Sequence, residues 1–167
     1  MYDTKKSKSV IIEFIGGEPF LEVDLIEEIY TYFIKQCIEY NHPWATSHMI
    51  SICSNGVLYF DPKVQAFIKR HLHELSFSIS IDGNKQLHDS CRVFPDGRGS
   101  YDIAHAAMRH FVDVFKGDMG SKMTIAPGNI NYVSDAIIAL IKDGYPTIHL
   151  NCVYEKGWNE KYAQILY

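Results

Sequence analysis

The chain has 167 residues, of which 47% are hydrophobic and 22% are charged; this is typical of a globular domain and excludes disordered and fibrous classes. A net charge of −4, with no basic run beyond Lys5–Lys8, argues against a dedicated nucleic-acid or membrane-surface binder. No apolar stretch approaches the ~18 residues of a membrane-spanning helix, and the N-terminus lacks the apolar core of a signal peptide. We therefore expect a cytoplasmic protein with free thiols, a disordered stub at residues 1–9 and one folded domain over 10–167.

Strands and helices are predicted to alternate along the whole chain. In order, the expected strands are 10–15, 48–54, 75–81, 122–126 and 147–152, and the expected helices are 23–40, 62–73, 100–116 and 131–142. Asn159 begins a further helix, whereas residues 86–90 are too polar and too few to assign. Ser100 is expected to cap the third helix, Gly117 and Gly120 to end it, and Gly144 to end the fourth in the left-handed conformation.

This alternation predicts parallel β-α units of roughly 30 residues. Two architectures remain open: a doubly wound sheet, or an arc of a β/α barrel, whose closed ring of eight units would need ~250 residues.

The polarity of the strands helps to choose. Strand 76–82 places serines and Asp82 on one face and Phe or Ile on the other, and the other strands show a milder form of this pattern, with Lys122, Thr124, His149 and Asn151 among its polar members. Strands covered by helices on both faces should be apolar on both. The pattern favours an arc whose concave face is wet and binds a polar ligand; the alternative is a flat sheet with satisfied core hydroxyls.

Candidate binding residues follow the C-terminal ends of the strands, where β/α folds hold ligands. Gly16-Gly17-Glu18-Pro19 offers a carboxylate and approachable backbone, which suits an ammonium group; the alternative is a tight turn. Ser54-Asn55-Gly56 is typical of a turn. Ser80 and Asp82 share a face, and Arg92 offers a forked donor set for a carboxylate; the alternative makes Asp82 a cap and Arg92 a solvated loop residue.

Several chemistries find no support in the residues. The Gly-rich phosphate loop is missing, and no Ser-His-Asp or Cys-His arrangement can be argued. His71 and His73 lie ~200° apart on a helix, so they cannot share a metal from one face. No catalytic residue and no metal ligand can be named from the sequence.

Taken together, the motifs Gly16–Pro19, Ser54–Gly56 and Ser80–Gly83, followed by His88-Asp89 and Arg92, resemble the radical S-adenosylmethionine (SAM) enzymes. The similarity is closest to the anaerobic sulfatase maturases and peptide maturases whose C-terminal extension is called the SPASM domain. It includes residues 92–102, 123–127 and 151–155, and it runs from about Val10 to the end of the chain. The resemblance implies an α/β fold, a partial (β/α)6 barrel of the radical SAM type, of which the chain covers about the second to the sixth strand.

The same resemblance implies a binding site for SAM. Gly16, Gly17, Glu18 and Pro19 would contact its amino end, and Ser80 and Arg92 would lie near its methionine carboxylate or ribose. Asn55 and Asp82 would be further members. The family also binds a 4Fe–4S cluster through Cys-x-x-x-Cys-x-x-Cys before Gly-Gly-Glu-Pro, but no cysteine precedes the first strand here, and the SPASM cysteines are absent too. We therefore expect an internal fragment without metal ligands.

The function implied is that of a radical SAM enzyme that cleaves SAM reductively and abstracts hydrogen from a peptide or protein substrate, with a reductant such as a flavodoxin or ferredoxin. The chain alone is expected to be inactive, because it cannot hold the cluster. Two alternatives stay open: a non-catalytic SAM-binding or inactive remnant protein, and an unrelated β/α enzyme acting on a phosphorylated metabolite.

Overall fold

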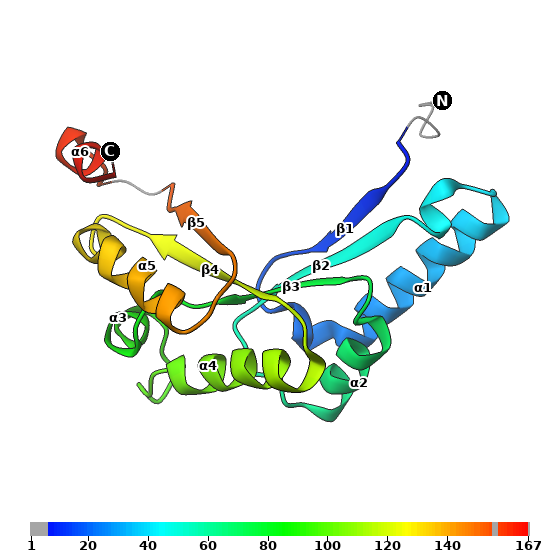
Figure 1. Ribbon diagram of the computed structural model, residues 1–167, viewed down its shortest axis with the longest axis horizontal. Coiled ribbons are helices and arrows are strands. Elements are labelled where there is room, and N and C mark those ends of the chain that lie inside the picture. The colour runs from blue at the N-terminus through cyan, green and yellow to red at the C-terminus, as the bar shows by residue number, and fades with distance from the viewer. Residues whose placement is uncertain (1–6, 155–156, 167) are drawn as a thin grey trace. The chain divides into compact units, whose positions relative to one another are not determined.

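The computed structural model describes residues 7–154 and 157–166 (Figure 1). The expected stub therefore lies largely outside the described residues, as does Glu155. The chain divides into two compact units. The first takes in the chain up to Ser54 together with Leu58–Phe77, and the second takes in Asn55–Val57 together with the chain from Ser78 onward.

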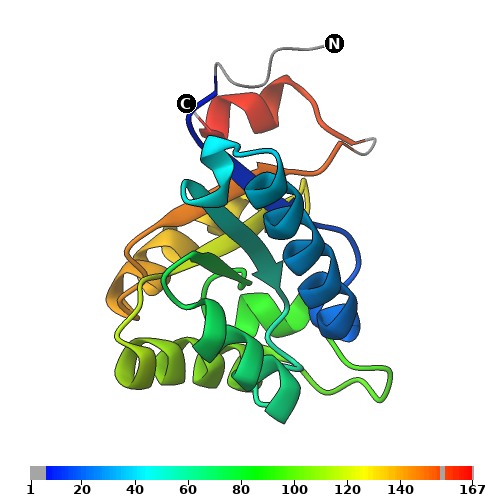
Figure 2. The same cartoon turned by 90° about the vertical axis from the view of Figure 1, so that its right-hand side faces the viewer.

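The first unit is built on two parallel strands and the start of a third. It contains β1 (Val10–Phe14), α1 (Val23–Glu39), β2 (His48–Ser54), α2 (Pro62–His71) and the first half of β3 (Leu75–Ser80). β1 pairs in parallel with β2, with Val10 opposite His48. Figure 2 shows α1 running alongside these two strands. The core of the unit comes from apolar side chains of its helices and strands, including Ile26, Ile52 and Phe67.

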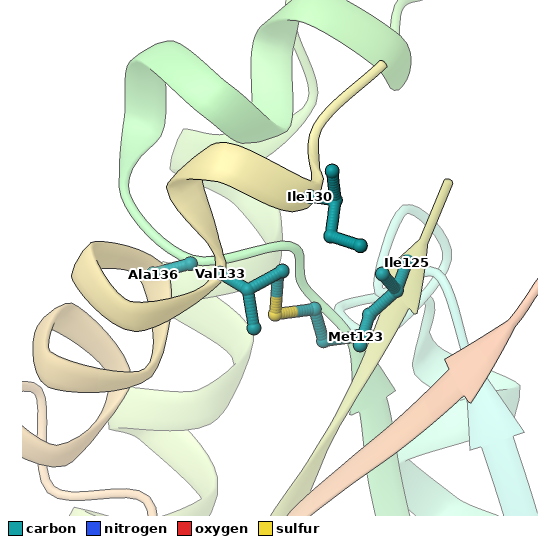
Figure 3. Close-up of a cluster of buried hydrophobic side chains, with 5 residues drawn as sticks. All are labelled: Met123, Ile125, Ile130, Val133 and Ala136. Carbon is teal, nitrogen blue, oxygen red and sulfur yellow. The ribbon is translucent and has the colours of Figure 1, made fainter. Parts of the chain in front are cut away.

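The second unit repeats the pattern. It contains the second half of β3, α3 (Lys85–Cys91), α4 (Tyr101–His110), β4 (Met119–Ile125), α5 (Val133–Lys142), β5 (Ile148–Cys152) and α6 (Glu160–Leu166). β4 pairs in parallel with β5. Figure 3 shows the core between β4 and α5, formed by Met123, Ile125, Ile130, Val133 and Ala136.

The strand order decides between the two architectures left open by the sequence. The sheet runs β1-β2-β3-β4-β5, so each strand lies next to its neighbour in the chain. A right-handed crossover to the next strand always passes over the same face of the sheet. This order therefore keeps the helices on one face, as in a β/α barrel, whereas a doubly wound sheet would reverse direction at a switch point.

Burial along the strands agrees with one covered face and one open face. In β4, Met119, Ser121, Met123 and Ile125 are buried, while Gly120, Lys122 and Thr124 are only partly covered. In β3, Phe77 and Ile79 are buried, while Ser78 and Ser80 are partly covered. The polar face predicted from the sequence is thus partly open to solvent.

Two local predictions were wrong, and the segment left unassigned is a helix. Residues 86–90 belong to α3, whose N-cap is Asn84; the Asn84 side chain accepts the Leu87 N–H. Ser100 precedes α4 but makes no side-chain cap, because its hydroxyl bonds elsewhere. Residues 111–115 continue α4 as a π-helix that ends at Lys116 in the left-handed conformation, so Gly120 belongs to β4. Gly144, with φ of 90°, follows α5 as expected.

Candidate functional site

The loop after β1, in the first unit, is open. Gly16 and Gly17 have φ angles of 103° and 46°, and a Cβ at either would meet no atom within 4 Å. Residues with a Cβ rarely adopt such φ angles. This backbone therefore needs glycine for its conformation and not for packing. Both residues are exposed, and the backbone here is approachable by a ligand.

Glu18 is the ordered carboxylate of this loop. It precedes a 3₁₀ turn that begins at Pro19, and its Oε1 accepts hydrogen bonds from Phe20 N at 3.2 Å and from Ser54 Oγ at 2.7 Å. Ser54, at the end of β2, is 1% exposed, while Glu18 is partly exposed. The structure thus joins the first two predicted motifs through a hydrogen bond that holds an anionic group beside exposed backbone, a combination suited to an ammonium ligand.

Asn55 and Ser80 lie in the second unit. The side chain of Asn55 accepts the Val57 N–H at 2.8 Å, which is the turn that the Asn-Gly pair predicts. Gly56 packs tightly, since a Cβ there would stand 2.7 Å from Ile79 Cδ1. Ser80 is the last residue of β3 and is partly exposed.

Asp82 and Arg92 form an ion pair at the end of β3. Arg92 Nε donates to Asp82 Oδ2 at 2.5 Å and Nη2 donates to Asp82 Oδ1 at 3.2 Å. Thr124 supplies two further contacts: its backbone N–H donates to Asp82 Oδ1 at 2.8 Å, and its hydroxyl accepts from Arg92 Nη2 at 3.2 Å. The side chain of Asp82 is 4% exposed and that of Arg92 is 28% exposed. Asp82 is thus neither a cap nor an open ligand, and Arg92 is not a solvated loop residue.

His88 supports this ion pair from α3. Its Nδ1 accepts the backbone N–H of Asp82, and its Nε2 lies 3.0 Å from Ser100 Oγ. Ser100 Oγ in turn donates to the Arg92 carbonyl oxygen at 3.1 Å. Because Nδ1 accepts and the Ser100 hydroxyl donates to the Arg92 carbonyl oxygen, the ring carries its proton on Nε2. Burial lowers the pKa of His88, against an opposing effect of the Asp82 charge, and so favours this neutral form. This network fixes the backbone on which both members of the ion pair stand.

The open face of the second unit carries further polar residues that the sequence did not single out as a site. Lys122 and Thr124 lie opposite His149 and Asn151 in the register of β4 and β5. Their polar alternation was visible in the sequence. A lysine inside a strand with a neighbouring strand on each side is the signal that could have identified a site.

No group of three His, Cys, Asp or Glu that could hold a metal ion is found among the described residues. The cysteines are free thiols, of which Cys37 is buried, Cys53 is partly covered, and Cys91 and Cys152 are exposed. No described helix is both long and apolar enough to cross a membrane.

Solved structures of one protein are similar to this chain. Hexahistidine-tagged anSMEcpe with bound AdoMet (AdoMet is SAM) matches with a TM-score of 0.70 and 17% identity, over 93% of this chain and 40% of that chain. Native anSMEcpe with bound AdoMet and Kp18Cys peptide matches with a TM-score of 0.71 and 17% identity, over 93% and 42% of the two chains. No protein-family model matches the chain, and no curated protein shows significant sequence similarity.

These similarities confirm the fold. anSMEcpe is a radical SAM anaerobic sulfatase maturase, and this chain spans about two fifths of its length. Consecutive strands in the order β1 to β5, with helices between them, form a partial radical SAM (β/α) barrel.

Proposed function

We propose that this chain binds SAM as the core part of a radical SAM enzyme, which cleaves SAM reductively and abstracts hydrogen from a peptide or protein substrate. The observation that carries the proposal is the similarity of 93% of the chain to anSMEcpe structures with bound AdoMet. One of those structures also contains the Kp18Cys peptide, which supports a peptide substrate. A flavodoxin or ferredoxin as reductant and a cytoplasmic location belong to the same proposal.

In the first unit, the loop Gly16–Pro19 is proposed to hold the amino group of SAM. Its exposed glycine backbone and the Glu18 carboxylate, fixed by Ser54, supply acceptors for an ammonium group. In the second unit, Ser80 and Arg92 are proposed to serve the carboxylate or ribose of SAM, with Asn55 as a further member. Asp82 belongs to the same set, and the ion pair described above gives it the role of holding Arg92. When bound, SAM would supply the radical chemistry, and the protein would orient it.

The described residues do not fit a 4Fe–4S cluster. Such clusters are held by cysteine thiolates, and no three-residue ligand group is present among the described residues. We therefore assign SAM binding to this chain, and we assign to it no reaction step that uses the cluster. The same observation favours a second candidate, a SAM-binding protein without catalysis.

The deciding experiment measures SAM affinity and melting temperature for three variants. Glu18→Ala and Ser80→Ala are expected to weaken SAM binding ~10- to 150-fold, the contribution of a hydrogen bond to a charged ligand, which is a larger effect than the one on folding. Glu18→Ala also lowers the melting temperature, because it removes the acceptor of Phe20 N and Ser54 Oγ. Asp24→Ala is the control: Asp24 pairs with Lys63 on the surface, and such pairs contribute little.

The proposed site is wrong if both variants bind SAM as tightly as the unaltered chain. Failure of the unaltered chain to bind SAM would overturn the function itself. SAM turnover after incubation with iron, sulfide and a reductant would separate the enzyme from the non-catalytic alternative. We expect no stable cluster to form under these conditions.

A further inference from the structure

Lys122 occupies an unusual position in the second unit. It lies inside β4, which has a neighbouring strand on each side, and it is partly covered. Side chains at such positions are commonly apolar in parallel sheets. Because Lys122 stands on the partly open face of β4, its ammonium group can meet an anionic ligand.

The neighbours of Lys122 on the same face are polar. The Ile81 N–H donates to the Lys122 carbonyl oxygen, which in a parallel ladder sets Ser80 beside Lys122. On the other side, Lys122 lies opposite His149. A Cβ built at Gly120 would stand 3.5 Å from Ser78 Cβ and 3.8 Å from His149 Cδ2, so these residues share one face.

The next row of this face is also polar. Thr124 lies opposite Asn151, and the Thr124 hydroxyl accepts from Arg92. The two rows together place two basic side chains, an imidazole and an amide on one surface of the second unit. We call Lys122, His149 and Asn151 the β4–β5 donor cluster.

This donor cluster has no counter-ion within the described part of the chain. None of its three side chains makes a hydrogen bond or an ion pair with another described residue. The sequences of β3, β4 and β5 contain no acidic residue. The nearest carboxylate along β3, that of Asp82, is already bonded to Arg92 and Thr124.

We propose that the β4–β5 donor cluster binds a carboxylate of the peptide substrate, so that the protein selects acidic peptides. The ammonium of Lys122 would provide the charge, and the ring N–H of His149 and the amide of Asn151 would donate to the carboxylate oxygens. Phosphates are commonly held at a helix N-terminus or by bidentate arginines, and this cluster contains neither. The peptide as the source of the carboxylate rests on the proposed function.

The test compares short peptides that differ in one group. The first has capped ends and one glutamate, the second has glutamine in its place, and the third has that glutamine and a free C-terminal carboxylate. Binding to the 167-residue chain is followed by NMR, with and without SAM, for the unaltered chain and for Lys122→Met and Lys122→Arg. Lys142→Met is the matched control, because Lys142 is an exposed lysine of the same unit.

We expect the unaltered chain to prefer one of the two carboxylate peptides about tenfold over the glutamine peptide, the worth of one charge-assisted hydrogen bond. The preferred peptide identifies the source as a side chain or a C-terminus, and its binding should shift the His149 ring signals. Lys122→Met should abolish the preference, whereas Lys122→Arg and Lys142→Met should retain it. SAM affinity should not change in any of these variants.

Equal binding of the three peptides by the unaltered chain would overturn the proposal. So would a preference that survives Lys122→Met, or a loss of SAM affinity in that variant without a change in peptide selectivity, since Lys122 would then serve SAM. An unaltered chain that selects acidic peptides but binds no SAM would overturn the proposed function and leave the carboxylate site standing.

Discussion

The loop after β1 and the loop after β3 end equivalent strands but are built in opposite ways. At Gly16 and Gly17 a Cβ would meet nothing within 4 Å, whereas at Gly83 it would stand 2.5 Å from Ala136 Cβ. Glu18 is partly exposed, whereas Asp82 is 3% exposed and forms an ion pair. The first loop leaves its backbone open, and the second is closed by packing and by the network around Arg92.

This difference separates two roles for a carboxylate at a strand end. Glu18 keeps an ordered carboxylate at the surface, where its Oε1 accepts from Phe20 N and Ser54 Oγ, and so can meet a ligand. Asp82 gives its oxygens to Arg92 and to the Thr124 N–H. Asp82 would therefore affect ligand binding only through the Arg92 guanidinium that it orients, which makes it a positioning residue.

The largest effect is expected from Arg92→Met. The substitution leaves the buried Asp82 carboxylate with the Thr124 N–H and without its charge partner. An unpaired buried charge of this kind costs about 3–5 kcal/mol, which urea denaturation would measure. Arg98→Met is the control, because Arg98 pairs with Asp96 in the same loop on the surface and should change stability by less than about 1 kcal/mol.

The double variant sharpens this prediction. Adding Asp82→Asn to Arg92→Met removes the uncompensated charge. The double variant should therefore be more stable than Arg92→Met alone. If Arg92→Met behaves like Arg98→Met, then the ion pair contributes nothing and the second loop is not closed by charge.

Glycine substitutions test the packing half of the comparison. Gly83→Ala adds a methyl group against Ala136 at a φ of 96°, and the two effects together should cost about 2–4 kcal/mol. In Gly16→Ala the added methyl group meets no atom within 4 Å, so only the φ of 103° destabilises the protein. We expect a loss of stability of about 1–2 kcal/mol. Thermal unfolding of the two variants side by side measures the difference, and equal losses would show that the two loops are packed alike.

Much of the architecture was predictable because it depends on local periodicity. The strand His48–Ser54 has its predicted bounds, and α1 and α2 lie within two residues of theirs. α3 was missed because Leu87 is its only large apolar residue. It forms because Asn84 caps its start and His88 bonds to the backbone of Asp82. These tertiary contacts leave no periodic signal.

The candidate site was predictable as a set of motifs but not as a set of partners. The sequence placed Asp82 and Arg92 in one motif, yet their bidentate pairing depends on where α3 sets Arg92. Ser100 shows the converse: a typical N-cap residue that instead bonds to the Arg92 carbonyl oxygen. For Lys122, the sequence shows a polar residue in a strand, but the lack of a counter-ion emerges only when its neighbours are known.

The smallest expected effect concerns pH and His88. Burial lowers the pKa of His88 in the folded protein below its ordinary value of 6.5. As the pH falls below about 6.5, the unfolded chain takes up a proton on this ring that the folded protein refuses. The contribution of His88 to stability is therefore fully present above that pH and is lost as the pH falls toward the folded pKa.

This loss has a slope of at most about 1.4 kcal/mol per pH unit. The groups facing the ring are Asp82, Asp89, Lys85 and Arg92, and the acidic ones partly offset the effect of burial. Urea denaturation between pH 7.5 and 5 should show that His88→Gln loses less stability on acidification than the unaltered chain does, although it starts lower because it lacks the bond to Ser100. Parallel pH profiles for the two proteins would mean that the ring takes up its proton as readily in the folded protein as in the unfolded chain, and the second loop would then be open to water as the first one is.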